Sequence, residues 1–195
     1  LTPENPAAPS DNSWPQSKAA DPARWYNDVM AYSDITGTAP AVLPTTPHFL
    51  ACPNVNELCW YIQEGKPHWD NTTLWATMGH LYVGGMWFKK KANINGFNTT
   101  SGPDGMDWRI HGNARTWPAS NSLPSVTDAG TYFYLPALGY YLYGQLRDVG
   151  LMGYYISSSA GHWGSSGANS LDIGSGQVRL YRYARRNGYS VGVFE

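Results

Sequence analysis

Charged residues are scarce in this chain of 195 residues. They make up 14% of it, with 13 Lys and Arg against 14 Asp and Glu, whereas ordinary globular domains carry about 25%. A nucleic-acid groove or a binder of anionic membranes needs a concentrated basic field. The composition therefore argues against both partners. Gly, Ser, Asn, Thr and Tyr take the polar role, a profile that suits secreted β-rich proteins and carbohydrate-contact modules.

Cysteines and long apolar runs are also few. The two cysteines are Cys52 and Cys59, and a predicted helix places Cys59 inside it and Cys52 just before its start. A bridge would need an awkward closing loop, so two buried thiols are expected rather than a disulfide. No run approaches the roughly 18 apolar residues of a membrane-spanning helix. A chain of this length can bury a core without a disulfide scaffold.

Recognisable catalytic and metal motifs are missing as well. The five histidines form no His-x-x-x-His pair and no Cys/His cluster of the zinc type, and no Gly-x-Ser-x-Gly elbow occurs. Ser157-Ser158-Ser159 follows a predicted strand and is expected to satisfy local backbone. Asp104, Asp107 and Asn113 offer oxygen ligands for calcium, but an ordinary polar loop explains them better. We expect no metal, no cofactor and no enzymatic activity.

The most patterned stretch is residues 132–159, where tyrosines alternate with glycines at 139, 144, 150 and 153. Tyrosine suits short strands, because its ring covers a half-buried sheet while its hydroxyl finds a polar partner. The glycines mark turns, bulges or close backbone approaches. The stretch predicts a tight, glycine-punctuated β core rather than a catalytic motif.

One helix is predicted over residues 54–63. Asn54 and Glu57 form a capping-box pattern, and the apolar residues that follow recur at i, i+3, i+4 and i+7. Before it, residues 1–20 are rich in Pro, Asn, Ser and Ala and predict an extended arm, and Asp21 is positioned to cap a short helix.

Strands are predicted in the rest of the chain. The predicted segments are a hairpin over 74–94 around Gly79 with Gly84-Gly85 at a bulge, then 168–173, 177–183 and 189–194. Asn187-Gly188 is a hairpin-turn signal before the last of them. Residues 95–131 are expected to be mostly loop. One early helix and several short strands indicate an α+β fold.

The last basic residues of the chain are Arg179, Arg182, Arg185 and Arg186. Arg179 and Arg185 share strand parity, so they are expected to line one solvated face. A row of surface charges that protects an edge strand is the interpretation we favour.

Residues 135–159, LPALGYYLYGQLRDVGLMGYYISSS, resemble the signature of the Fibrobacter succinogenes major paralogous domain, which has an LPAAGYR-like run, a G-x-L-x-x-V-G segment and GYYWSS. Shorter similarities lie at Asp21-Pro22, at Pro53 to Glu57 and at Arg185 to Val191. The resemblance spans roughly residues 21–195. It implies a single α+β, C-type-lectin-like domain over 21–195, with short twisted antiparallel strands, one or two helices and long loops, related to the formylglycine-generating enzymes.

The resemblance also implies a function. The family consists of exported bacterial surface proteins, so the expected location is extracellular or at the outer-membrane surface. We expect a non-enzymatic domain that serves adhesion, associated with fimbriae or modular surface chains. Its partners would be other surface or pilus subunits, or host or dietary glycans. The related formylglycine-generating enzymes need reactive cysteines late in the chain, and none follows Cys59.

Two departures from the family pattern concern cysteine. Ala23 and Val193 stand where the family has cysteines. The loss of both together suggests that these cysteines pair in other members, and that an apolar contact between Ala23 and Val193 replaces the bridge here.

A carbohydrate-binding module is the alternative hypothesis. Nine tryptophans exceed what one core of this size needs, and Trp69, Trp108, Trp117 and Trp163 lie in loop-like context. A sugar ring can stack on an exposed indole, and His162-Trp163, among small residues, is the least core-like of these positions. The competing explanation is that the tryptophans pin long loops to the body. The sequence favours that explanation, and the exposure of the rings decides the matter.

Overall fold

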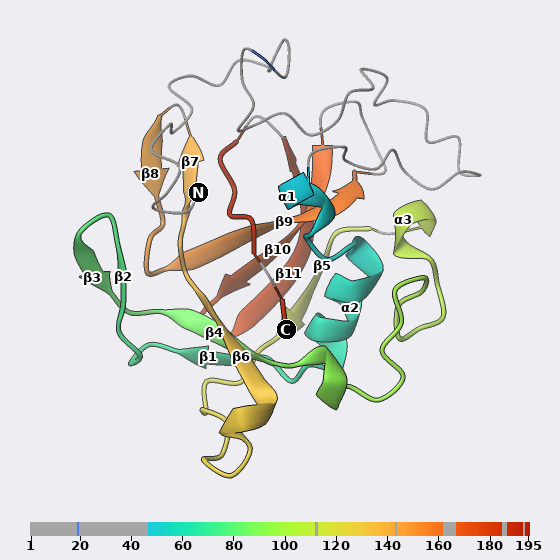
Figure 1. The fold of residues 1–195 in the computed structure, drawn as a ribbon, viewed down its shortest axis with the longest axis horizontal. Coiled ribbons are helices and arrows are strands. Elements are labelled where there is room, and N and C mark those ends of the chain that lie inside the picture. Colours follow the sequence, from blue (N-terminus) through green and yellow to red (C-terminus); the bar gives the residue numbers. More distant parts are fainter. Residues whose placement is uncertain are drawn as a thin grey trace.

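The computed structural model describes residue 19 and residues 47–111, 113–142, 144–161, 167–184, 187–192 and 194–195 (Figure 1). The helical elements are α1 (Pro47–Leu50), α2 (Val55–Gln63) and α3 (Trp108–His111), with the 3-10 turns η1 (Lys91–Asn93) and η2 (Ala129–Thr131). The strands are β1 (His68–Asp70), β2 (Trp75–Thr77), β3 (His80–Tyr82), β4 (Gly85–Lys89), β5 (Arg115–Pro118), β6 (Tyr132–Pro136), β7 (Tyr140–Leu142), β8 (Gln145–Arg147), β9 (Met152–Ala160), β10 (Gly167–Gly174) and β11 (Gln177–Ala184).

Besides His162, Trp163, Arg185 and Arg186, which also lie outside this set, three expectations for the ends of the chain fall on residues outside it. They are the extended arm over residues 1–20, apart from residue 19, the short helix starting at Asp21, and the contact between Ala23 and Val193. These stay predictions.

Two larger sheets and two hairpins make up the described β structure. The larger sheets have the strand orders β5-β11-β10-β9 and β1-β4-β6, while β2-β3 and β7-β8 are two-stranded. Their strands all pair antiparallel. With α2 beside them (Figure 1), this mixture confirms the predicted α+β class. Among the described residues no helix has the length and apolar character needed to cross a membrane.

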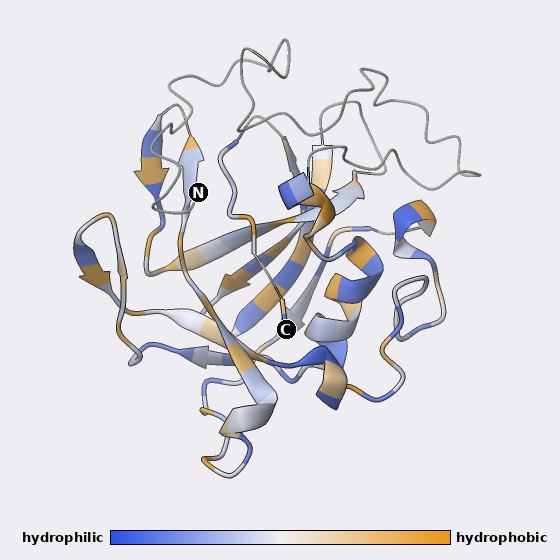
Figure 2. Cartoon of the chain, in the orientation of Figure 1, coloured by the Kyte–Doolittle hydropathy of each residue, from blue (hydrophilic) through white to orange (hydrophobic). Residues whose placement is uncertain are grey.

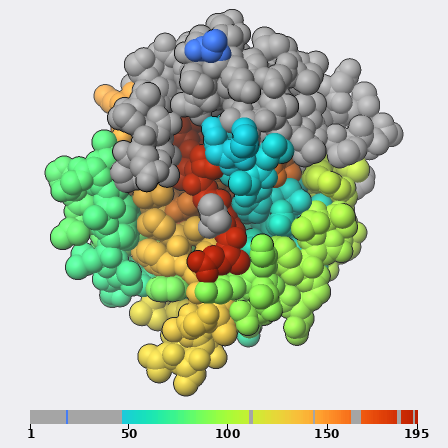
Figure 3. Space-filling view, in the orientation of Figure 1, coloured from blue at the N-terminus to red at the C-terminus, as the bar shows by residue number. Residues whose placement is uncertain are grey.

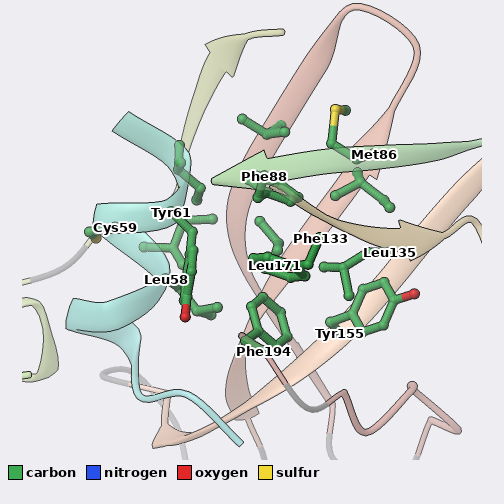
Figure 4. Close-up of a cluster of buried hydrophobic side chains, with 14 of the residues drawn as sticks. Leu58, Cys59, Tyr61, Met86, Phe88, Phe133, Leu135, Tyr155, Leu171 and Phe194 are labelled. Atoms are coloured by element: carbon green, nitrogen blue, oxygen red, sulfur yellow. The ribbon is translucent and has the colours of Figure 1, made fainter. Parts of the chain in front are cut away.

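The main core lies between α2 and the inner faces of the two larger sheets (Figure 4). Strand alternation places it there, because successive side chains point to opposite faces of a sheet. Along β4, Met86 and Phe88 are fully buried while Trp87 between them is half-buried. Figure 2 shows hydrophilic and hydrophobic residues alternating along β11 in the same way.

The C-terminal residues Phe194 and Glu195 pack against this core. Phe194 is buried, and its ring lies 5.2 Å from that of Tyr61 on α2. The Tyr61 hydroxyl donates a hydrogen bond to the carbonyl oxygen of Glu195. Figure 3 shows the C-terminal segment (red) at the surface between α2 (cyan) and the orange residues of the 132–159 stretch.

The predicted helix and its capping box are confirmed. The Asn54 side chain accepts hydrogen bonds from the backbone N–H groups of Asn56 and Glu57, at 2.9 and 3.1 Å. The Glu57 carboxylate accepts one from the Asn54 N–H at 2.8 Å. The first turn of α2 is therefore satisfied by side chains from its own sequence.

Cys52 and Cys59 are free and buried, as predicted. Burial raises the pKa of the Cys52 thiol to about 12. Burial, reinforced by the charge of Asp104, also raises the pKa of Cys59. Neither thiol ionises near neutral pH, so Cys59 is a core residue and not an activated nucleophile.

The predicted hairpin around Gly79 is confirmed, because β2 and β3 pair and Thr77 lies opposite His80. Its strands do not continue into β4. Gly84, with a φ of 96°, ends the hairpin, and β4 then pairs with β1 and β6. A Cβ on Gly84 would lie 2.2 Å from the carbonyl oxygen of Gly150. The glycine pair expected at a bulge therefore marks a change of sheet.

The predicted β character of residues 132–159 is confirmed by β6, β7, β8 and β9. Gly139, Gly144 and Gly150 all have positive φ, a conformation that glycine adopts without strain. The serine run is placed differently from the prediction. Ser157 to Ser159 lie inside β9 and are buried, and the Ser159 hydroxyl accepts a hydrogen bond from the N–H of Val55 on α2.

Apart from α3, β5 and η2, the described residues within 95–131 are loop, as predicted. Two other predictions for the later segments are wrong. β5 pairs with β11 along Gln177 to Leu180, so β11 is no edge strand there. Asn187-Gly188 does not begin a hairpin with β11, whose pairing partners are β5 and β10. Gly188 instead forms an isolated bridge with Tyr141, and Ser190 forms one with Tyr155. The closing segment thus crosses over to β7 and β9.

Candidate functional site

The outer face of the β1-β4-β6 sheet carries the most distinctive group of side chains. Trp69, Met86 and Phe88 point inward to the core, so their neighbours along the strands point outward. The strand register sets His68, Trp87 and Tyr134 side by side in one row across the sheet. All three are half-buried.

Six rings form a group over this side of the molecule, which we call the aromatic sheet face. They make up three pairs: Trp87 with Tyr134 at 5.0 Å between centroids, His68 with Tyr132 at 5.6 Å, and Trp75 with Tyr82 at 5.2 Å. The last pair is stacked across the β2-β3 hairpin, with 27° between ring planes. It adjoins the sheet because the side chain of Trp75 lies beside the Tyr134 hydroxyl.

Asp70 holds the middle of the site in place. Its buried carboxylate accepts hydrogen bonds from the backbone and hydroxyl of Thr72, from the backbone and hydroxyl of Thr73, and from Trp87 Nε1. Burial opposes ionisation, but the hydrogen bonds from Thr73, Trp87 and Thr72 outweigh it and lower the pKa of Asp70. Both oxygens are occupied, so Asp70 turns the chain and orients Trp87 instead of contacting a ligand.

The Trp75 indole, like that of Trp87, is held by a hydrogen bond from its Nε1 atom. Its Nε1 donates a hydrogen bond of 2.8 Å to the carbonyl oxygen of Gly84, while Trp87 Nε1 donates to Asp70 at 2.9 Å. The polar atom of each half-buried indole is therefore satisfied within the protein. What each indole presents is its ring, already fixed in orientation, which is the arrangement of a pre-organised binding surface.

Tyr134 has an unusual environment at the junction of the ring pairs. Its ring lies over Gly85, where a Cβ would come within 2.3 Å of it. The Tyr134 hydroxyl is buried and makes no hydrogen bond of good geometry within the described part of the chain, although the Trp75 side chain lies beside it. Burial, followed by the charge of Asp70, raises its pKa. An unsatisfied buried hydroxyl costs about 1–3 kcal/mol.

Polar atoms border the aromatic sheet face. His68 Nδ1 contacts the carbonyl oxygen of Ser122, so Nδ1 carries the hydrogen and Nε2 is the acceptor in the neutral ring. Lys89 lies opposite Tyr132 on the neighbouring strand and is half-buried. Within the described part of the chain no group of His, Cys, Asp and Glu is arranged to hold a metal ion.

The residues singled out by the sequence lie elsewhere. Trp69 and Trp108 are 8% and 2% exposed and belong to the core. Trp117, on β5, is half-buried and packs against Trp108 at 6.1 Å. These tryptophans lie on β1, α3 and β5, so the loop-like context predicted for them is wrong. His162 and Trp163 lie outside the described residues.

The sequence analysis missed Trp75 and Trp87. A usable signal was present in the strands, because Trp87 sits between apolar Met86 and Phe88 and Tyr134 sits between Phe133 and Leu135. In β4 the polar Lys89 shares the strand parity of Trp87, which marks Trp87 as facing away from the core.

A second polar cluster lies on the other side of the four-stranded sheet. Asp172 is fully buried; it accepts hydrogen bonds from Ser170 Oγ and from the Tyr183 hydroxyl, and lies 3.2 Å from Arg179 Nη2. Burial raises the pKa of Asp172 to about 6, against the opposing effects of Arg179, Ser170 and Tyr183. Arg179 therefore neutralises a buried carboxylate. The prediction that Arg179 lines a solvated face and protects an edge strand is wrong.

Tyrosine rings surround this cluster, and they come from β7, β9, β11 and the closing segment. They are Tyr140, Tyr154, Tyr183 and Tyr189, with neighbouring centroids between 4.7 and 5.9 Å. The cluster ties the β7-β8 hairpin and the closing segment to the sheet. We assign it a structural role.

Comparison with known proteins adds no identification. No family model matches the chain, and neither a curated protein nor a solved structure does. Function is therefore argued from the geometry, and the family resemblance stays a prediction.

Asp172 makes a testable contribution to the pH dependence of stability. Its folded pKa is raised above the unfolded value of about 3.9, so the folded chain binds the proton more tightly. The stabilisation is present below the unfolded value and is lost as the pH rises through about 6. Relative to Asp172→Asn, the wild-type free energy of unfolding should fall by roughly 2–3 kcal/mol between about pH 4 and pH 7. Urea unfolding at several pH values measures it, and a constant difference would contradict the assignment.

Removing the Tyr134 hydroxyl should not weaken the fold. Tyr134→Phe deletes an unsatisfied buried group, so the free energy of unfolding should stay the same or rise by about 1 kcal/mol or more. Tyr155→Phe is the matched control, because the Tyr155 hydroxyl donates to the carbonyl oxygen of Pro136 at 2.6 Å. That variant should lose about 1 kcal/mol. Equal losses in both variants would show that the Tyr134 hydroxyl has a partner in solution.

Proposed function

We propose that this protein is a non-enzymatic domain of a bacterial cell surface, with a C-type-lectin-like form of the α+β fold, and that it serves adhesion by binding glycans. The aromatic sheet face is the observation that carries the proposal. Its half-buried indoles are locked by hydrogen bonds to Asp70 and Gly84. Surfaces fixed in advance bind without the entropic cost of ordering side chains.

Ring surfaces suit carbohydrate because a sugar has one polar and one less polar side. The less polar side stacks on an indole or phenol ring, and the hydroxyls at its rim seek donors and acceptors. Lys89 and the Nε2 atom of His68 supply a donor and an acceptor beside the rings. The buried thiols and the saturated Asp70 contribute no reactive group, which fits recognition better than catalysis.

The proposal predicts the effect of losing one ring. Beads coated with the domain should adhere to a glycan-coated surface, and Trp87→Ala should reduce the bound fraction several-fold, because truncating an aromatic anchor commonly costs more than about 1 kcal/mol. Tyr181→Ala is the control, since Tyr181 is 42% exposed on β11, away from the site. Equal adhesion by wild type and Trp87→Ala would contradict the proposal. Circular dichroism verifies that both variants fold.

A second candidate function is assembly with other surface or pilus subunits, favoured by the β2-β3 hairpin. One side of it carries the Trp75–Tyr82 stack, and the other exposes apolar residues. Leu74 and Leu81 are 66% and 70% exposed, and Leu151 on the adjacent turn is 69% exposed. The hairpin stands at the edge of the molecule (Figure 1). Contiguous exposed apolar residues are typical of protein contacts.

Serine substitution tests this second candidate. The double variant Leu74→Ser/Leu81→Ser should lose capture of purified pilus subunits in a pull-down, because it removes the apolar contact. Val126→Ser is the control, since Val126 is 93% exposed in the loop before β6. Capture that survives the double variant, or that the control abolishes equally, argues against the hairpin as the contact.

A further inference from the structure

We infer that the aromatic sheet face binds the middle of an extended glycan chain, across several consecutive sugar rings, and not a single terminal sugar. The inference rests on the proposed function and specifies its ligand. It follows from how the three ring pairs are laid out relative to one another.

The ring pairs are spread over more than one strand spacing. His68, Trp87 and Tyr134 share a row across three strands, and adjacent strands are about 4.8 Å apart, so the row spans about 10 Å. The Trp75–Tyr82 stack is displaced along β4, because Trp75 is tied to Gly84. Gly84 directly precedes β4, and Gly85, the first residue of β4, precedes Trp87 by two residues, which corresponds to about 7 Å of strand.

These two platforms form one surface. The Tyr134 hydroxyl lies beside the Trp75 side chain, while the Tyr134 ring contacts that of Trp87. A ligand that covers only one platform leaves the rings of the other platform exposed to water. A chain that follows β4 contacts both, and it gains from each added ring without any new ordering of the protein.

The polar atoms are placed for the rim of such a chain. His68 stands in the row with Trp87, and Lys89 lies at the end of β4 remote from the hairpin, opposite Tyr132. Asp70, between the platforms, is fully engaged by protein donors. The Tyr134 hydroxyl at the junction of the platforms is buried. The centre of the face therefore offers ring stacking, which favours the flat sides of linked sugars over one hydroxyl-rich terminal unit.

Chain-length dependence tests the inference. The wild type is probed on an array of glucose, xylose, mannose and N-acetylglucosamine, each with the disaccharide and hexasaccharide of the corresponding cellulose, xylan, mannan or chitin series. At least one series should bind, with an affinity about tenfold or more higher for the hexasaccharide than for the monosaccharide. Trp75→Ala should remove this gain, Trp75→Phe should keep most of it, and Tyr181→Ala should leave it unchanged.

The outcomes separate the inference from the function on which it rests. Equal affinity for monosaccharide and hexasaccharide, or a length gain that survives Trp75→Ala in a folded variant, overturns the extended-chain inference while glycan binding stands. Absence of binding to every series overturns the glycan-binding function as well, and leaves the hairpin contact as the remaining candidate. Urea unfolding of Trp75→Phe and Trp75→Ala shows whether a lost gain reflects the ring or the fold.

Discussion

The carboxylate of Asp70 is the interaction on which the described site depends. Asp70 is the last residue of β1. Its carboxylate accepts hydrogen bonds from Thr72 and Thr73, which begin the link to the β2-β3 hairpin, and from the Trp87 indole on β4. Removing a carboxylate from water is costly unless its oxygens are satisfied. The donors that satisfy the Asp70 carboxylate are the two threonines of the turn and the Trp87 indole. One buried charge therefore sets both the direction of the chain after β1 and the orientation of the Trp87 ring.

The same strands build the core and the proposed binding surface. Met86 and Phe88 are fully buried, whereas Trp87 between them faces outward. A sheet with one face packed and one face open needs this alternation. The rigidity of the core is thereby passed to the outer rings, since a side chain cannot shift far when its strand is clamped on the opposite face. A slip of one residue in register would bury Trp87 and expose Phe88.

Local patterns were enough to predict α2, its capping box, the Gly79 hairpin and the strands β10 and β11, because each depends on residues close in sequence. The residues of the aromatic sheet face were harder to predict, because the exposure of a side chain is decided by distant partners. Trp108 was predicted to lie in a loop, yet its backbone N–H donates a hydrogen bond to the side chain of Asn56 on α2, and its ring is buried in the core. Asn187-Gly188 had the right turn residues, but Gly188 and Ser190 bridge Tyr141 and Tyr155, which are distant in sequence, instead of β11.

The two tyrosines Tyr134 and Tyr155 differ in whether their buried hydroxyls contribute to the stability of the fold. Both lie near Pro136 in the sheet region, and the Tyr155 hydroxyl donates to its carbonyl oxygen, as a buried phenol should. The Tyr134 hydroxyl has no such partner, so phenylalanine would serve the fold equally well or better. The hydroxyl lies where the two ring platforms meet, beside Trp75. Because the hydroxyl is buried there, only protein atoms can satisfy it, and its cost is set by how the rings of Tyr134, Trp75 and Trp87 pack at that junction.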